Sequence, residues 1–265
     1  SVLFGRAYQH LFFIAPYSEL FWDENMLAPL FELFQVEWSA YLSWDLMFYY
    51  QHFCGIILTL GLVVACLPEV YRKRFRVVFL LNALILTIIA IALFKGNFFR
   101  IGQFIEYSAQ FGCVYLFYFW HRDNAFKRVS IYDIIRVLVA LTFIGHGLYA
   151  IGYYNTPYNF SQMVWETFPF FTEKMTTSFL MVFGVLDLIA VALLFVNSRP
   201  VLYRGALTYC IIWGALTAFA RIVSTFYIEM PLMSLHDGIY EVIYRFPHFL
   251  LPLILLLFDQ KEKRS

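Results

Sequence analysis

Three ionisable residues lie close together in an apolar stretch near the end of the chain. Glu241, Arg245 and His248 are separated by four and three residues, so a helix places them on one face. An arginine can hold an anionic or carbonyl oxygen, and a glutamate or a histidine can exchange protons. The spacing predicts a ligand-binding face, and Pro247 predicts a bend beside His248. The alternatives are that Glu241 lies among lipid headgroups, or that it pairs with Arg245 only to order the helix.

Polar residues earlier in the chain follow a similar pattern. Gln103, Glu106 and Gln110 stand at spacings of three and four residues. His146 has a glycine on each side, and small residues allow the close approach of another helix or of a ligand. We predict that Glu106, Gln110, His146 and His52 line one pocket together with Glu241, Arg245 and His248. For His52, which follows two tyrosines, a place in an interfacial aromatic belt is an equal alternative.

One acidic residue lies deep within an apolar run. Asp187 is part of VLDLIAVALLF, and a carboxylate at membrane depth normally has a buried partner. The expected partner is Arg136 or Arg221. The three residues are candidates for a proton relay, with a packing role as the alternative.

The histidines and cysteines bear on metal and redox chemistry. No two histidines are three or four residues apart, so no single helix carries a metal motif and we predict no metal site. Haem would have to be held between helices, and it is a weaker candidate than a quinone. The four cysteines fall inside apolar runs without a C-x-x-C motif, which disfavours dithiol exchange and leaves Cys54 and Cys113 as the one plausible pair.

The amino-acid composition indicates the environment that surrounds these residues. Of 265 residues, 62% are hydrophobic, 21% aromatic and 14% charged, and the formal net charge is +1. Soluble domains are roughly half apolar and a quarter charged, so this composition excludes a soluble fold, disorder and a nucleic-acid-binding protein. The chain is predicted to be an all-α polytopic membrane protein in contact with lipid.

Apolar runs indicate the helices that must position the polar residues. A membrane-spanning helix needs about 20 mainly apolar residues. Seven runs meet this need, and the opening segment is interpreted as an eighth span rather than a signal peptide. The predicted spans are 1–17, 41–67, 77–94, 104–120, 132–151, 174–197, 204–223 and 239–258.

The charges in the connecting segments predict the orientation. Basic residues gather in every second connection and in the tail, whereas residues 18–40 hold five acidic residues and no Lys or Arg. Lys95 and Arg100 in the third connection are the exception to this pattern. The basic groups are Arg72, Lys73, Arg74, Arg76; Arg122, Lys127, Arg128; Arg199, Arg204; and Lys261, Lys263, Arg264. The excess of Lys and Arg in cytoplasmic loops predicts that both termini are cytoplasmic and that most of the polar residues above lie in the extracytoplasmic half.

The two halves of the chain are similar in pattern. Arg6 precedes Phe13 by the same interval that separates Arg136 from Phe143. Residues Gln103, Ile105, Gln110 and Phe111 align with Glu241, Ile243, His248 and Phe249. We predict two parallel four-helix repeats, 1–128 and 129–265, within one membrane domain, with the site at their interface. Chance similarity between apolar helices is the alternative.

A family resemblance follows from the second half. Arg136 with FIGHGLYAIGYYNTP (143–157) resembles the opening helix and His-Gly turn of the DoxX-like superfamily of four-helix membrane units. SLHDGIYEVIYRFPHF (234–249) is similar to uncharacterised bacterial relatives of that group. The resemblance implies a bacterial inner-membrane location and an association with quinone or thiol redox chemistry, although relatives without a redox role exist.

Three functions fit these observations. The first is a membrane protein that binds a small amphipathic or redox-active ligand, such as a quinone, in the extracytoplasmic half. The second is a proton-coupled transporter, which needs a polar connection through Asp187. The third is a non-catalytic subunit that packs against partner subunits of a larger membrane complex. The residues do not decide whether a reaction is catalysed.

Overall fold

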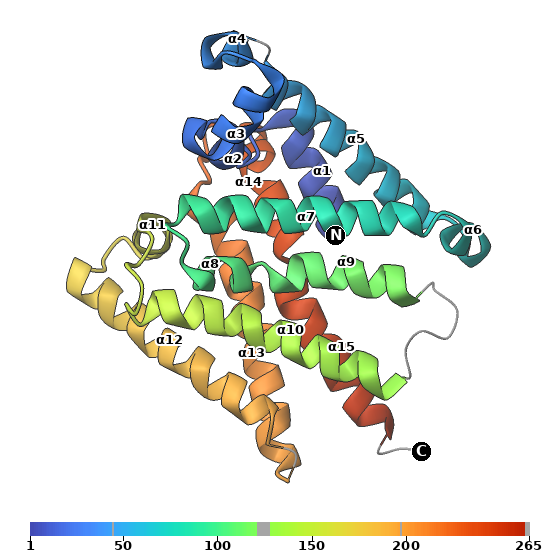
Figure 1. Cartoon of the computed structure of the whole chain (residues 1–265). Helices are drawn as coiled ribbons and strands as arrows, with labels where there is room; N and C mark the ends of the chain where they lie inside the picture. Colours follow the sequence, from blue (N-terminus) through green and yellow to red (C-terminus); the bar gives the residue numbers. More distant parts are fainter. Residues whose placement is uncertain (44, 121–127, 197, 263–265) are drawn as a thin grey trace.

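The described residues, 1–43, 45–120, 128–196 and 198–262 of a computed structural model, form helices and no strand (Figure 1). Six helical segments are long and apolar enough to cross a membrane. They are α5 (Leu46–Cys66), α7 (Val77–Gly96), α10 (Arg128–Ala150), α12 (Glu173–Leu194), α13 (Pro200–Ser224) and the pair α14 (Pro231–Arg245) and α15 (Pro247–Glu262). These segments correspond to six of the eight predicted spans. The chain is therefore an all-α protein suited to a membrane.

The other two predicted spans take a different form. The segment 1–17 contains α1 (Val2–Phe12), whose 11 residues reach only about 16 Å along the helix axis, half of the hydrocarbon thickness. The segment 104–120 is divided at Tyr107 into α8 (Ile101–Glu106) and α9 (Ser108–Trp120). Neither segment is among the described helices that are both long enough and apolar enough to cross a membrane. The predicted count of eight spans is therefore not confirmed.

Short helices connect the long ones. Between α1 and α5 lie α2 (Ser18–Phe21), α3 (Glu24–Phe34) and α4 (Trp38–Ser43), while α6 (Glu69–Arg74) precedes α7 and α11 (Tyr158–Thr167) follows α10. At the position of the predicted bend the helix is interrupted, because α14 ends at Arg245 and α15 begins at Pro247. Arg245 and His248 therefore lie on either side of this interruption.

Helices of the two halves pack against one another. Helix α1 packs on α5 of its own half and on α14 of the other half, while α10 packs on α12 and on α8. Helix α7 packs on α9, and α13 packs on α15. Helices α9, α10 and α15 meet near the centre of Figure 1. Each of α8 and α14, the segments that carry the polar residues, is therefore held against a helix from the opposite half.

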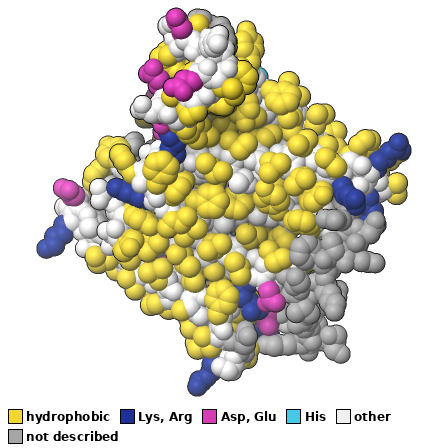
Figure 2. Space-filling view, viewed as in Figure 1, with side chains coloured by type: hydrophobic (Ala, Val, Ile, Leu, Met, Phe, Trp, Pro, Cys, Tyr) yellow, Lys and Arg dark blue, Asp and Glu magenta, His cyan; other side chains and the backbone are white. Residues whose placement is uncertain are grey.

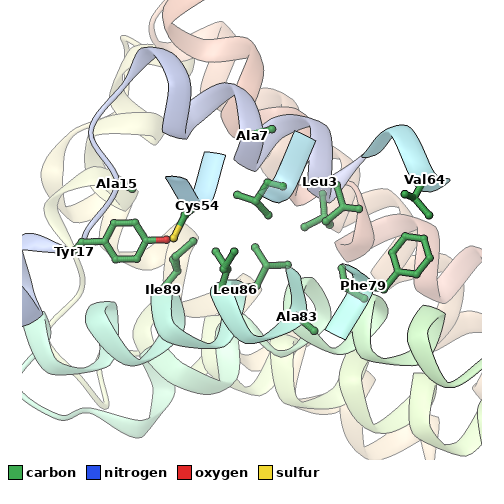
Figure 3. Packing of buried hydrophobic residues seen from close by; sticks show 14 residues of the cluster. Leu3, Ala7, Ala15, Tyr17, Cys54, Val64, Phe79, Ala83, Leu86 and Ile89 are labelled. Atoms are coloured by element: carbon green, nitrogen blue, oxygen red, sulfur yellow. The ribbon is translucent and has the colours of Figure 1, made fainter. Parts of the chain in front are cut away.

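Two apolar cores support this arrangement. Figure 3 shows the first, in which α1, α5 and α7 enclose side chains such as Leu86 and Ile89. The second lies between α10, α12, α13 and α15 and includes Leu194, Leu207 and Cys210. The site described below lies next to this second core.

Glycines bring the backbones of the helices into contact. An added Cβ at Gly145 would lie 2.8 Å from the amide nitrogen of Glu106 and 2.8 Å from the carbonyl oxygen of Gly102. A Cβ at Gly5 would lie 2.7 Å from the amide nitrogen of Tyr244. These contacts allow α10 to touch α8 and α1 to touch α14, so only a residue without a side chain fits at either position.

The surface is mostly apolar, and charged side chains lie at its margins. Hydrophobic side chains cover most of the face in Figure 2, with acidic side chains over α2–α4 at the top and basic ones over α6 at the right. Lys95 at the end of α7 pairs with Asp23 at 2.6 Å, and Asp23 also caps α3 by accepting from the amide of Met26. Arg122, Lys127, Lys263 and Arg264, used for the predicted orientation, lie outside the described residues.

Candidate functional site

The structure gathers four of the predicted site residues where α8, α10, α14 and α15 meet. Glu106 Oε1 lies 3.7 Å from His146 Nε2, and the rings of His146 and His248 have centroids 5.4 Å apart. His248 Nδ1 donates a hydrogen bond to the carbonyl oxygen of Arg245 at 2.8 Å. The histidine is therefore fixed in orientation by the helix break that precedes it, with Nε2 left for another partner.

Two further predicted residues form an ion pair beside this group. Arg221 Nη1 donates to Glu241 Oε2 at 2.7 Å, joining α13 to α14. The alternative that Glu241 pairs with Arg245 is therefore not what the structure has. The guanidinium of Arg245 instead lies 5.2 Å from the ring of Tyr244.

Three buried nitrogen atoms in these side chains have no hydrogen-bond partner among the described residues. Within the described part of the chain, His146 Nε2, Arg221 Nε and Arg245 Nη1 have no hydrogen-bond partner, and 3.7 Å is too long for a hydrogen bond from His146 to Glu106. Arg245 is only 7% exposed. Leaving a buried donor unpaired costs about 1–3 kcal/mol, and more for a charged group, so such atoms mark a place where a ligand can bind.

A cavity of about 440 Å³ is lined by the three residues that carry these nitrogen atoms. Its volume is within the range of roughly 300–1,000 Å³ that is typical of small-molecule sites. Its polar wall includes His146, Asp187, Arg221, Arg245 and His248, from five helices. Its apolar wall is rich in aromatic rings, namely Phe160, Phe168, Phe179, Phe183, Trp213 and Phe219. The cavity combines an apolar body with one strongly polar region, which suits an amphipathic molecule.

Asp187 lies on the same cavity but has a partner that the sequence did not predict. The hydroxyl of Tyr209 donates to Asp187 Oδ1 at 2.8 Å, and the side chain of Trp213 also donates to this carboxylate. The prediction that Asp187 pairs with an arginine is wrong. Arg221 forms an ion pair with Glu241, and Arg136 Nη1 lies 3.6 Å from Asp133 Oδ1. The neighbouring helix α13 presents neutral donors toward α12, and these satisfy the carboxylate without a second charge.

Gln110 belongs to a different buried contact. Arg6 donates from Nε and Nη2 to Gln110 Oε1 at 3.1 and 2.7 Å and from Nη1 to Gln9 Oε1 at 2.7 Å. Its guanidinium lies 3.8 Å from the centre of the Tyr244 ring. Gln110 is not among the described residues that line the cavity. In the sequence Arg6 served only as a marker of the repeat, although a lone arginine in an apolar helix is itself a signal of a buried polar contact.

His52 lies away from the cavity. Its Nδ1 donates to the carbonyl oxygen of Phe48 one turn earlier, at 2.9 Å, and its ring is 4.1 Å from the ring of Phe48. It does not appear among the described cavity-lining residues. The local bond within α5 and the neighbouring aromatic side chain agree with the interfacial alternative.

The other described histidines and the cysteines form no recognisable centre. His236 is hydrogen-bonded to Tyr8, and His10 is hydrogen-bonded to Tyr17. Across residues 1–43, 45–120, 128–196 and 198–262 there is no group of three or more His, Cys, Asp or Glu side chains that could hold a metal ion. In the same ranges all four cysteines are free.

Comparison with known proteins adds no family assignment. No protein-family model matches the chain, and neither a curated protein nor a solved structure is found to be similar to it. The function must therefore be argued from the geometry of the cavity, and the resemblance of segments 143–157 and 234–249 to DoxX-like units stays a prediction.

Proposed function

We propose that this integral membrane protein binds a small amphipathic molecule in the cavity between α10 and α13, with the polar end of the molecule at Arg245, His146 and His248. The observation that carries the proposal is a set of unpartnered nitrogen atoms in three residues that line an otherwise apolar cavity, described above for the residues 1–43, 45–120, 128–196 and 198–262. An oxygen acceptor that reaches these atoms satisfies them and removes the cost of leaving them without a partner.

A quinone is one candidate for this molecule. Its flat ring can pack on the aromatic wall, where Phe183 and Trp213 already stack with centroids 3.9 Å apart at an angle of 11°. Its carbonyl oxygens can accept hydrogen bonds from Arg245, and a neutral histidine such as His146 or His248 can donate a further one. The quinone and its redox role are proposals that also draw on the DoxX-like resemblance.

We also propose the finer architecture that the sequence predicts: eight spans as two parallel repeats, in a bacterial inner membrane, with both termini cytoplasmic. Two observations support it. The partners of α1 and α10 correspond between the two halves, and the basic helix α6 and the acidic segment α2–α4 lie at opposite ends of α5.

Binding can be tested by the fluorescence of Trp213, which lies on the cavity wall. A short-chain ubiquinone analogue, which quenches tryptophan on contact, is titrated into the purified protein in phosphatidylcholine vesicles, with Trp213→Phe identifying the signal from the cavity. We expect saturable quenching, weakened about tenfold or more in His248→Ala, since tenfold corresponds to about 1.4 kcal/mol. Arg204→Gln, which removes an arginine paired with Asp259 outside the cavity, should bind like the wild type. Equal binding by His248→Ala and the wild type contradicts the assignment.

A second candidate function is proton-coupled transport. It is favoured by the position of Asp187, which lies on the same cavity as the histidines although it sits deep in α12. A transporter needs this carboxylate, whereas a binding site open to one side does not. Measurement of proton flux into proteoliposomes separates the two: Asp187→Asn abolishes flux in a transporter and leaves binding intact in a binding protein.

A further inference from the structure

One buried arginine at the polar end of the cavity has no direct counter-charge. Arg245 lines the cavity and is only 7% exposed, and within the described part of the chain no carboxylate forms an ion pair with it. Arg221 and Glu241 form a direct pair, and Arg6 is bonded to the neutral amides of Gln9 and Gln110. Because a buried charge is costly without a counter-charge, an anion is the group that best completes this site.

Asp187 does not supply this missing charge. Its carboxylate accepts from Tyr209 and Trp213, and no ion pair links it to an arginine in the part of the chain that the structure describes. Arg245 Nη1 and Arg221 Nε, on two helices that line the cavity, have no acceptor among the described residues. A carboxylate accepts charge-assisted hydrogen bonds from guanidinium groups and supplies a negative charge, whereas a carbonyl oxygen supplies none.

The cavity reaches the outer surface of the helical bundle. Three residues of α13 that line it, Leu216, Phe219 and Val223, are 56%, 49% and 55% exposed. They belong to a helix that is long and apolar enough to cross a membrane, so their exposed sides face lipid rather than water. An occupant can therefore enter sideways from the bilayer.

The volume limits the size of the occupant. A cavity of about 440 Å³ is in the lower half of the range of roughly 300–1,000 Å³ that is typical of small-molecule sites. The occupant that we consider is therefore a small molecule with one hydrocarbon chain and a small head group.

From this charge, opening and volume we infer that the occupant is a single-chain lipid with a carboxylate head group, which enters between lipid-facing residues of α13 and is held by Arg245 and Arg221. The inference rests on the proposed binding function and narrows its ligand class. The carboxylate lies at the arginines and His146, and the chain lies along the aromatic wall formed by Phe179, Phe183 and Trp213.

The experiment compares an acid with its neutral counterpart. A medium-chain ω-bromo fatty acid and the matching ω-bromo alcohol are titrated into wild-type protein in phosphatidylcholine vesicles at alkaline pH, where the acid is ionised. Bromine quenches tryptophan on contact, so Trp213 reports occupancy of the cavity and Trp213→Phe gives the background. We expect the acid to bind the wild type at least about tenfold more tightly than the alcohol does.

Variants locate the effect within the cavity. Arg245→Gln is expected to weaken the acid about tenfold without changing the alcohol, and Arg204→Gln is the matched control. Ala220→Phe fills the cavity while keeping both arginines and should abolish quenching by either probe, whereas Ile212→Phe, at a 55% exposed position of α13 outside the cavity lining, should not. The comparison of acid and alcohol on the wild type stands even if Arg245→Gln fails to fold.

The outcomes separate the inference from the proposed function. Equal affinity of acid and alcohol, or tighter binding of a neutral ubiquinone analogue than of the acid, overturns the anionic ligand and leaves the binding function in place. If no probe quenches Trp213, or if Ala220→Phe leaves the quenching unchanged, both the inference and the proposed function fail.

Discussion

The carboxylate of Asp187 is stabilised within an apolar helix by hydrogen bonds from Tyr209 and Trp213. Replacing Tyr209 with Phe removes the donor at 2.8 Å and leaves Trp213 as the remaining donor. We expect the free energy of unfolding to fall by about 1–3 kcal/mol, because a buried polar group loses its partner. Equilibrium unfolding in mixed micelles measures this change.

A double-mutant cycle gives the control for that prediction. In the Asp187→Asn background, Tyr209→Phe should cost less, since the group that needs the donor is then neutral. Tyr153→Phe, at a 70% exposed position, should have little effect on stability. If Tyr209→Phe costs the same in the wild type and in the Asp187→Asn background, the hydrogen bond has no direct role.

At the scale of helices, the contact between α8 and α10 depends on Gly145. A Cβ in Gly145→Ala would lie 2.8 Å from backbone atoms of α8, and backbone cannot rotate away as a side chain can. We expect α8 to shift, which separates Glu106 from His146, and stability to fall by about 1–3 kcal/mol through overpacking. Ligand titration and unfolding of the same preparation measure both effects.

Gly205 provides the matched control on another helix. A Cβ there has no described atom within 4 Å outside its own surroundings, so Gly205→Ala should leave stability unchanged or raise it through the better helix propensity of alanine. If both substitutions behave alike, close packing at Gly145 is not what holds α8 in place.

The sequence predicted helices well and their interruptions less well. The apolar runs that became α5, α7, α10, α12 and α13 are long enough for hydropathy alone to define them. Pro247 indicated the break before α15, since proline cannot continue a helix. The break at Tyr107 has no proline or glycine beside it, and it arises where α8 is pressed against α10. Such a break depends on tertiary packing, which local residue patterns do not contain.

The candidate site was predicted in part for the same reason. The helical spacing placed Glu241, Arg245 and His248 on one segment, and the glycines beside His146 indicated a close contact. The partners across helices were not predictable, because the pairing of Arg221 with Glu241 and of Tyr209 with Asp187 depends on which helices are neighbours. Spacing could not decide between the two alternatives for His52, because it does not reveal which side of an apolar helix faces lipid.

For the whole molecule, the Asp23–Lys95 pair ties the acidic segment after α1 to the end of α7. A hydrogen bond from Lys95 lowers the pKa of the Asp23 carboxyl below its ordinary value. The pair therefore stabilises the fold at pH values above the unfolded pKa of about 3.9, and this contribution is lost as the pH falls through the folded pKa. Unfolding followed from about pH 5 to about pH 2 should show this loss, and Asp23→Asn should lack this component. An identical pH profile in the variant excludes the pair as its source.

The proposed orientation of the molecule can be tested by labelling. Single cysteines are placed at Glu32 in α3 and at Lys73 in α6, in a background with the four native cysteines replaced. In intact cells, a membrane-impermeant maleimide should label Glu32→Cys and should label Lys73→Cys only after the membrane is opened. The reverse pattern contradicts the assignment of basic segments to the cytoplasm.

The bond between Arg6 and its partners has a consequence for biosynthesis. Gln110 is made 104 residues after Arg6, and Tyr244 follows roughly 240 residues after it. At about 5–20 residues per second, the ribosome needs on the order of 10 to 50 s to complete both partners. An arginine at the centre of a bilayer costs about 2.5–3.5 kcal/mol on insertion scales, so we expect α1 to stay at the membrane surface during that time. Helix α1 is then made before its partners in α9 and α14 but takes its final place only after both of them have been synthesised.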